Sequence, residues 1–423
     1  FMKDGPKNRL RDMDLHKIVD AFNKRLDIAK YSRMVSVEEI EKNDFNLNLP
    51  RYIDSQQAED RQDIEGHLKG GIPKADVDAL QRYWDVCPDL RKALFKPVMD
   101  KTRPNYLDLA VDKAAIKTTI YEHQQFVGFI NEMNAWFTQW QSHVATQLKQ
   151  LKPGFHPKTL IHDLAEVLLS HYTGKPLIDH YDVYQHLMDY WAETMQDDCY
   201  LIAAPADDGG GWQATTYRVI ETDKKGREKD KGWACDLIPK SLIVARYFAS
   251  EQAAIAALEA ETESLAALLV ELEEEHGGEE GAFAELEKIN RANVNARLKE
   301  IKDDMEAKDE IAALTAWLKL ADEEADNKKM LREAESALDA KALAKYPKLS
   351  EAEIKTLVVD DKWLAAMDAR IHGEMSRISQ ALTQRVKELA ERYEAPLQTM
   401  VDRVAALEMN VNRHLEKMGF AWR

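Results

Sequence analysis

The amino-terminal residues carry the densest group of side chains suited to binding phosphate. Lys3, Lys7, Arg9 and Arg11 lie within nine residues, and Asn8 stands among them. Arginine and lysine contact phosphate oxygens, and an asparagine amide can hydrogen-bond to a nucleic-acid backbone or a base edge. We therefore predict these five residues as DNA-contact candidates. Three aspartates close by offset part of the charge, so the alternative interpretation is a solvated surface loop.

No other group of residues forms a convincing catalytic or metal-binding pattern. The sequence contains neither GxGxxG nor GxxxxGK[ST], the two common phosphate-cradle motifs. His180 and His186 are six residues apart, which places them on different sides of one helix. His162 and Glu166 share a helix face but lack a third ligand. We therefore predict no catalytic, cofactor-binding or metal-binding residues in this chain.

The cysteines and the hydropathy pattern indicate the cellular environment. Cys87, Cys199 and Cys235 are too far apart for a CxxC site, which argues against a disulfide framework or a cysteine-ligated zinc. No run of 18 apolar residues and no signal peptide is visible, so we expect a cytoplasmic protein with no membrane partner. A start at Phe1 is unusual, and we expect the chain to be the carboxy-terminal part of a longer one.

The composition predicts a mainly α fold. The chain has 423 residues, 45% of them hydrophobic, and only 17 Gly and 13 Pro. Such a chain can bury a sizeable core, and scarce turn residues favour helices. The net charge of −17 is uneven, because residues 251–345 hold 12 Lys and Arg against 25 Asp and Glu, a net −13. That acidic segment is unsuited to binding nucleic acid.

Breaks in the helical periodicity divide the chain into five parts. Serines at helix starts with glutamate three residues later (Ser36 with Glu39, and Ser350 with Glu353) predict two capping boxes. The run CYLIAA at 199–204 is β-prone, and two further β-prone runs flank a turn. The predicted parts are 1–55, the end of a larger domain; 56–198, a helical domain; 199–240, a small β hairpin or meander and the only β structure; 241–346, a first coiled-coil arm; and 347–423, a second arm.

Heptad spacing dominates the second half of the chain. Apolar residues from Ile255 to Leu272 alternate at intervals of three and four, as in a coiled-coil seam. Between the two arms, Tyr346 and Pro347 break the helix. We therefore predict a long antiparallel coiled-coil hairpin made of the two arms. The partner-interface candidates on the second arm are Ile371, Met375, Ile378, Leu382, Val386 and Leu389.

The amino-terminal segment resembles a known family. The resemblance rests on two runs, FMKDGPKNRLRDMDLHKIVDAF and EEIEKNDFNLNLPRY. They are similar to the end of the methyltransferase domain in modification (M) subunits of type I restriction–modification systems, which are γ-class adenine-N6 DNA methyltransferases. The runs IDSQQAEDRQDIEGHLKGGIP and IDHYDVYQHLMDYWAETMQDD, and the ending HLEKMGF, resemble the helical tail of the long form of these subunits.

The resemblance implies a DNA-modifying enzyme of which this chain is one part. Members bind S-adenosylmethionine on a glycine-bearing loop and grip the flipped adenine with an Asn-Pro-Pro-Phe motif. This chain contains no Pro-Pro, so we expect it to be inactive alone and S-adenosylmethionine to belong to the full-length subunit. The implied partners are the specificity (S) subunit, the restriction (R) subunit and double-stranded DNA. The alternative is a coiled-coil scaffold or adaptor that is not an enzyme.

Overall fold

The chain forms two compact units, and each is rich in helices. The computed structural model describes residues 2–54, 62–205, 207, 209–222, 226–278, 281–302, 304 and 307–419. Unit 1 comprises residues 1–203 and 363–423, and unit 2 comprises 204–362. The predicted mainly α fold with small β elements is confirmed. Within the described ranges, no helix is long and apolar enough to cross a membrane.

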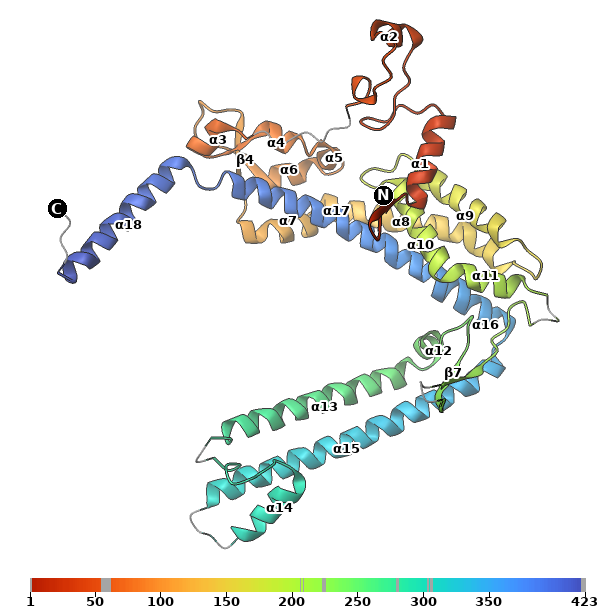
Figure 1. The fold of residues 1–423 in the computed structure, drawn as a ribbon, viewed down its shortest axis with the longest axis vertical. Coiled ribbons are helices and arrows are strands. Elements are labelled where there is room, and N and C mark those ends of the chain that lie inside the picture. The colour runs from red at the N-terminus through yellow and green to blue at the C-terminus, as the bar shows by residue number, and fades with distance from the viewer. Residues whose placement is uncertain are drawn as a thin grey trace. The chain divides into compact units, whose positions relative to one another are not determined.

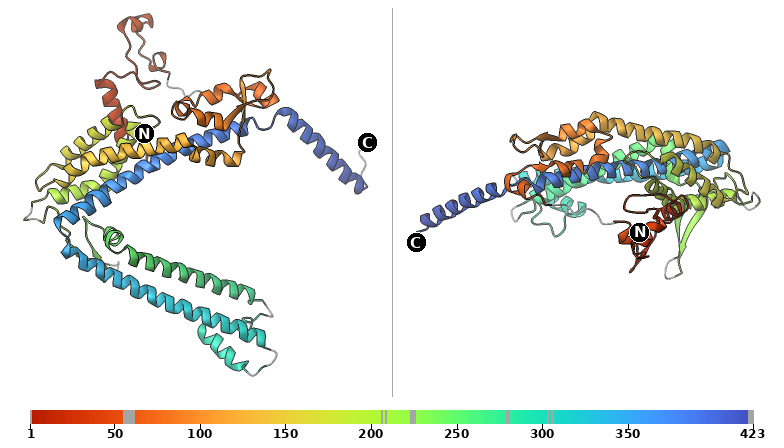
Figure 2. Two further views of the ribbon diagram at one scale, coloured as in Figure 1. Left: turned by 180° about the vertical axis from the view of Figure 1, so that it is seen from behind. Right: turned by 90° about the horizontal axis from the view of Figure 1, so that it is seen from above.

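Unit 1 is built around one long helix near the carboxyl end of the chain. Its main helices are α7 (Ile116–Glu122), α8 (Gln124–Lys149), α9 (Pro157–Tyr172), α10 (His180–Tyr190), α11 (Gln196–Ala203) and α17 (Ala365–Arg392). Helix α17 packs against α7 and α10, while α8 packs against α7 and α9 (Figures 1 and 2). The apolar stripe of α8 from Met133 to Leu148 is buried and forms part of the core.

The amino-terminal part of unit 1 contributes short elements. They are β1 (Met2–Asp4), β2 (Lys7–Arg9), α1 (Asp12–Asn23), α2 (Val37–Lys42) and a 3-10 turn, η1 (Leu49–Arg51). The Ser36 side chain accepts a hydrogen bond from the Glu39 N–H at the start of α2. The Glu39 carboxylate binds Arg33 (2.8 Å), so the structure shows one half of the predicted capping box.

Residues 62–115 of unit 1 include a three-stranded sheet, so the prediction that 199–240 holds the only β structure was wrong. The elements of residues 62–115 are α3 (Ile64–Lys69), β3 (Ile72–Pro73), α4 (Lys74–Asp78), α5 (Gln81–Trp84), α6 (Pro88–Leu94), β4 (Phe95–Pro97), β5 (Tyr106–Leu109) and η2 (Lys113–Ala115). The antiparallel order is β3-β5-β4. These strands have two to four residues, which is too short to show an alternating pattern. Residues 55–61, at the predicted domain boundary, lie outside the described residues.

The predicted strand in CYLIAA was wrong, because this run lies in helix α11 and just beyond it. Cys199 and Ile202 are three residues apart and both fully buried, which requires a helical face. The indole N–H of Trp363, also in unit 1, donates to Asp198 (2.7 Å). A π-helical turn, η3 (Trp191–Met195), joins α10 to α11 and keeps the helix continuous. The β-prone composition was therefore overridden by packing in the core of unit 1.

Unit 2 contains the antiparallel helical hairpin. Its elements are β6 (Tyr217–Thr222), β7 (Glu228–Ala234), α12 (Lys240–Tyr247), α13 (Ala249–Glu275), α14 (Arg291–Glu300), α15 (Lys308–Lys345), η5 (Tyr346–Lys348), α16 (Glu351–Lys355) and the π-helical η6 (Thr356–Leu364). The pair β6–β7 is the predicted hairpin, and the capping box of Ser350 with Glu353 is complete.

The two helices of the hairpin are α13 and α15, and both lie within the predicted first arm. The chain reverses between residues 276 and 307, where His276-Gly-Gly interrupts the seam. In contrast, Tyr346 and Pro347 produce only a 3-10 turn before α16. Helix α17, from the predicted second arm, packs in unit 1. The chain therefore reverses after the glycine pair, whereas Pro347 lies at the start of a 3-10 turn, a position where proline is tolerated.

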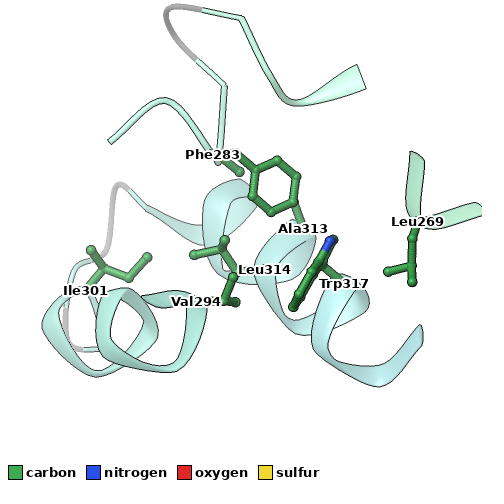
Figure 3. Close-up of a cluster of buried hydrophobic side chains, with 8 residues drawn as sticks. Leu269, Phe283, Val294, Ile301, Ala313, Leu314 and Trp317 are labelled. Carbon is green, nitrogen blue, oxygen red and sulfur yellow. The ribbon is translucent and has the colours of Figure 1, made fainter. Parts of the chain in front are cut away.

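A small hydrophobic core closes the tip of this hairpin. It joins α13, α14, α15 and the turn after α13 (Figure 3). Val294 and Leu314 are fully buried in it. The indole N–H of Trp317 donates to the Glu273 carboxylate (2.8 Å), so the one polar atom of this buried side chain has a hydrogen-bond partner. The hairpin therefore ends in a packed structure of its own. The buried members are Leu269, Ala282, Phe283, Val294, Ile301, Ala313, Leu314 and Trp317.

Candidate nucleic-acid and partner interfaces

The β1–β2 hairpin carries four of the five predicted DNA-contact residues, and all four are exposed. Gly5 has φ +59° at the first position of a two-residue loop, as a type II′ turn requires. The register pairs Lys3 with Asn8. Directly paired side chains share one face and successive ones alternate, so Lys3 and Asn8 lie on one face while Lys7 and Arg9 lie on the other. The hairpin divides the candidates into two pairs.

The fifth candidate, Arg11, is engaged within its own helix. Its backbone N–H (2.9 Å) and its guanidinium (3.0 and 3.1 Å) donate to the Asp14 carboxylate. The hydrogen bonds from Arg11 hold the pKa of Asp14 well below its usual range. Arg11 therefore fixes the start of α1, and a phosphate would have to compete with a bidentate carboxylate for it.

Helix α1 exposes a group of apolar side chains whose spacing places them on one face of the helix. It docks on α10 through its other side, where the Met13 N–H donates to Gln185 (2.9 Å) and the Tyr181 hydroxyl donates to Asp20 (3.1 Å). Phe22 is 83% exposed. A row of large apolar residues on one helix face usually marks a contact with another surface. The exposed members are Leu15, Ile18, Val19 and Phe22.

The six predicted partner-interface residues lie inside unit 1. All of them are on α17, and each is 5% exposed or less. They face α7 and α10, which pack against this helix. In this chain they therefore form part of its own core. The six are Ile371, Met375, Ile378, Leu382, Val386 and Leu389.

Helix α18 (Leu397–Lys417) presents an uncovered heptad seam. Its first turn meets α3, and the remainder extends away from the rest of unit 1 (Figure 1). The seam positions repeat at intervals of three and four, and the apolar ones are 48–72% exposed. The spacing of the apolar residues is visible in the sequence, but the partner contacts were predicted on α17 instead. The apolar seam residues are Leu397, Met400, Val404, Leu407, Val411 and Met418.

In the described ranges, no three His, Cys, Asp or Glu side chains are placed so that they could hold a metal ion. The three cysteines are free thiols and buried. Burial raises the pKa of Cys87 to about 11, which leaves it a protonated and unreactive thiol at neutral pH. His186 lies 3.8 Å from the Glu374 carboxylate, where it serves a polar contact between α10 and α17.

Comparison with known proteins finds similarity over short segments of the chain. Residues 1–61 match the family described as N-6 DNA Methylase. The type I restriction enzyme MjaVII methylase subunit of Methanocaldococcus jannaschii is 43% identical over 58 residues, 14% of this chain. The MjaVIII methylase subunit of the same organism is 35% identical over 76 residues, 18% of this chain. The MpnII methylase subunit of Mycoplasma pneumoniae is 25% identical over 93 residues, 22% of this chain.

The matched segments are short relative to these proteins. They span 10%, 13% and 17% of the MjaVII, MjaVIII and MpnII subunits, respectively. No solved structure matches the chain. Residues 1–61, which the family matches, include the β1–β2 hairpin, α1 and α2. The chain is thus similar to N-6 DNA methylases in its first 61 residues, and over short segments to methylase subunits of type I restriction enzymes.

Proposed function

We propose that this chain is the carboxy-terminal part of a type I restriction–modification methylase subunit and that it serves in assembly with the specificity subunit and in holding DNA. The observation that carries the proposal is the match of residues 1–61 to N-6 DNA methylases. Those residues form the hairpin with exposed Lys3, Lys7 and Arg9, which suits contacts to a DNA backbone. The restriction subunit is the further partner of such a complex.

The seam of α18 supports the assembly role. A heptad stripe is stable in water only when a second surface covers it, and the described part of unit 1 leaves most of this one open. Long helices with a matching seam would cover it by knobs-into-holes packing. We therefore assign α18, rather than α17, as the surface that binds the helices of the specificity subunit.

The described residues do not fit a site for S-adenosylmethionine. Every strand pair in the described ranges is antiparallel, whereas the cofactor loop of this family follows a strand of a Rossmann-like sheet. The sequence also lacks Pro-Pro. We expect no transfer of a labelled methyl group from S-adenosylmethionine to DNA by the 423-residue chain. Measurable transfer would contradict this part of the proposal.

The acidic hairpin of unit 2 fits the role of a spacer. Its seam is covered internally, because Ile255, Leu265 and Leu269 of α13 are buried in the pair with α15. The segment 251–345 has a net charge of −13, which repels a phosphate backbone. We propose that this hairpin does not contact DNA.

Co-elution of the chain with its specificity subunit tests the assembly role. Val404→Asp with Val411→Asp places two charges on the α18 seam, and we expect the complex to be lost on size exclusion. The matched control, Ala405→Asp with Asn412→Asp, adds the same charge at the same seven-residue spacing on the face of α18 that points away from the seam, and it should leave the complex intact. Circular dichroism confirms that both variants fold. Co-elution of the seam variant at wild-type yield would contradict the role of α18.

A further inference from the structure

A second positively charged surface lies on α17, far along the sequence from the amino-terminal hairpin. A cavity of about 600 Å³ opens between α7 and the solvent side of α17. Its charged lining residues are all basic, namely Lys117, Arg377 and Lys387. The other lining residues are uncharged and mostly polar: Tyr121, Gln380, Ala381, Thr383 and Gln384. We call these eight residues the α7–α17 groove.

The three basic residues of the groove differ in how they are paired. The Arg377 guanidinium donates to Glu374 (2.8 Å) and to Asp182 (3.1 Å), so two carboxylates of unit 1 already pair with its charge. In the part of the chain that the structure describes, neither Lys117 nor Lys387 forms an ion pair. The Lys117 ammonium lies 5.7 Å from the centre of the Tyr121 ring. Among the described residues, Lys117 and Lys387 are thus the two cations of the groove that have no carboxylate partner.

The groove follows a regular stripe on α17. Gly373, Arg377, Gln380, Gln384 and Lys387 recur at intervals of three and four, so they share one face of the helix. From Gly373 to Lys387 the helix rises about 21 Å, which matches several phosphates of one strand at about 3.4 Å of duplex axis per phosphate. The stripe itself contains no acidic residue, and a partly exposed neighbouring carboxylate, Glu388, accepts a hydrogen bond from Gln384 (3.0 Å). Such a face can lie along a polyanion.

Gly373 adds a separate observation. It lies in the interior of α17, where glycine weakens a helix relative to alanine. A Cβ at this position would meet nothing within 4 Å, so packing inside the chain does not require glycine here. One use of glycine is to let another molecule approach the backbone closely. The open space above Gly373 lies at one end of the stripe.

We propose that the α7–α17 groove binds the sugar–phosphate backbone of double-stranded DNA, with Lys117 and Lys387 contacting phosphates and Gln380 donating an amide hydrogen bond. The proposal rests on the proposed function, which makes duplex DNA the polyanion present. Contacts of this kind are independent of base sequence and position the protein on the duplex. The groove would be a second DNA-binding surface of unit 1, beside the β1–β2 hairpin.

The salt dependence of DNA binding tests the groove. The probe is a fluorescein-labelled duplex of about 30 base pairs, titrated with the 423-residue chain between about 50 and 200 mM salt. Lys117→Gln with Lys387→Gln should reduce the slope of log K against log salt by about 1.8, because each phosphate contact contributes about 0.9. The matched control, Lys152→Gln with Lys158→Gln, removes the same charge from exposed positions outside the groove and should leave the slope unchanged.

Two results would overturn the proposal that the groove binds DNA. The first is an unchanged slope in the Lys117 and Lys387 variant; if that variant also loses co-elution with the specificity subunit, the groove is assigned to a protein partner. The second is an equal decrease of the slope in the control. None of these results affects the α18 seam experiment, so failure of the groove and failure of the proposed assembly role can be told apart.

Discussion

Helices α17 and α18 carry the same kind of sequence pattern and have opposite surroundings. Both are long, and both repeat apolar residues at intervals of three and four. The stripe of α17 is buried against α7 and α10, with Leu382 and Val386 fully covered. The seam of α18 is open, with Val404 54% exposed. Pro396 separates the two helices. Periodicity therefore identifies the face that needs a cover, and the fold decides whether the chain itself supplies one.

The largest expected effect is a difference in stability when one leucine of each helix is replaced by alanine. Leu382→Ala should reduce the free energy of unfolding by about 2–5 kcal/mol, because it removes a buried side chain and leaves a cavity. Leu407→Ala on the α18 seam should change it by less than about 0.5 kcal/mol, because that side chain is exposed in the free chain. Urea unfolding of the purified chain measures both. Equal effects would mean that α18 is covered in solution.

A second prediction concerns the charged group that α17 buries. Burial raises the pKa of Glu374, but His186 and Arg377 outweigh burial and lower it to about 2, from an ordinary value of 4.5. The folded state therefore favours the ionised form, and this stabilisation is present above pH 4.5 and lost as the pH falls toward 2. Glu374→Gln should cost about 1.5–3 kcal/mol at pH 7.

The pH profile of unfolding checks the sign of this effect. The stability gap between wild type and Glu374→Gln should narrow as the pH falls from about 4.5 to about 2. A gap that stays constant over this interval would show that Glu374 ionises equally well in the folded and unfolded chains. Since α18 buries no carboxylate in this way, Glu408→Gln on that helix should leave the profile unchanged.

The smallest effect concerns the joint where α17 ends and α18 begins. A Cβ on Gly66 of α3 would come within 2.9 Å of the Tyr393 ring at the end of α17. Gly66→Ala should therefore cost about 1–3 kcal/mol through overpacking. Gly128→Ala in α8 is the control, because nothing lies within 4 Å of its Cβ, and it should be neutral or stabilising by up to about 1 kcal/mol. Urea unfolding measures both variants. Equal free energies of unfolding would show that close packing of α3 against Tyr393 does not stabilise the junction of α17 and α18.

The sequence predicted the helical class because composition and period are local properties. The stripe of α8, the seam of α13 and the box at Ser350 all follow from spacing within one element. The short strands of the β3-β5-β4 sheet could not be found in this way, because pairing between distant residues creates them. The helix at Cys199 was missed for the same reason, since its conformation depends on core contacts such as that of Asp198 with Trp363.

The interface candidates show a second limit of sequence reasoning. Lys3, Lys7, Asn8 and Arg9 lie close together in the sequence, yet strand alternation divides them between two faces. The six apolar candidates of α17 have the correct spacing for a partner surface, but α7 and α10 cover them. The spacing of apolar residues in a helix does not show which surface covers them, another helix of the same chain or a partner. Only the assembled fold shows that α18 keeps its seam open.

Hydrogen exchange of the backbone amides of α17 and α18 tests the central claim most directly. In the free chain we predict slow exchange along α17 and fast exchange along α18, because only α17 is packed. Addition of the specificity subunit should slow exchange along α18, from Met400 to Leu415, and leave α17 unchanged. Protection of α18 in the free chain, or unchanged exchange after the subunit is added, would contradict the proposal that its seam is the partner-binding surface.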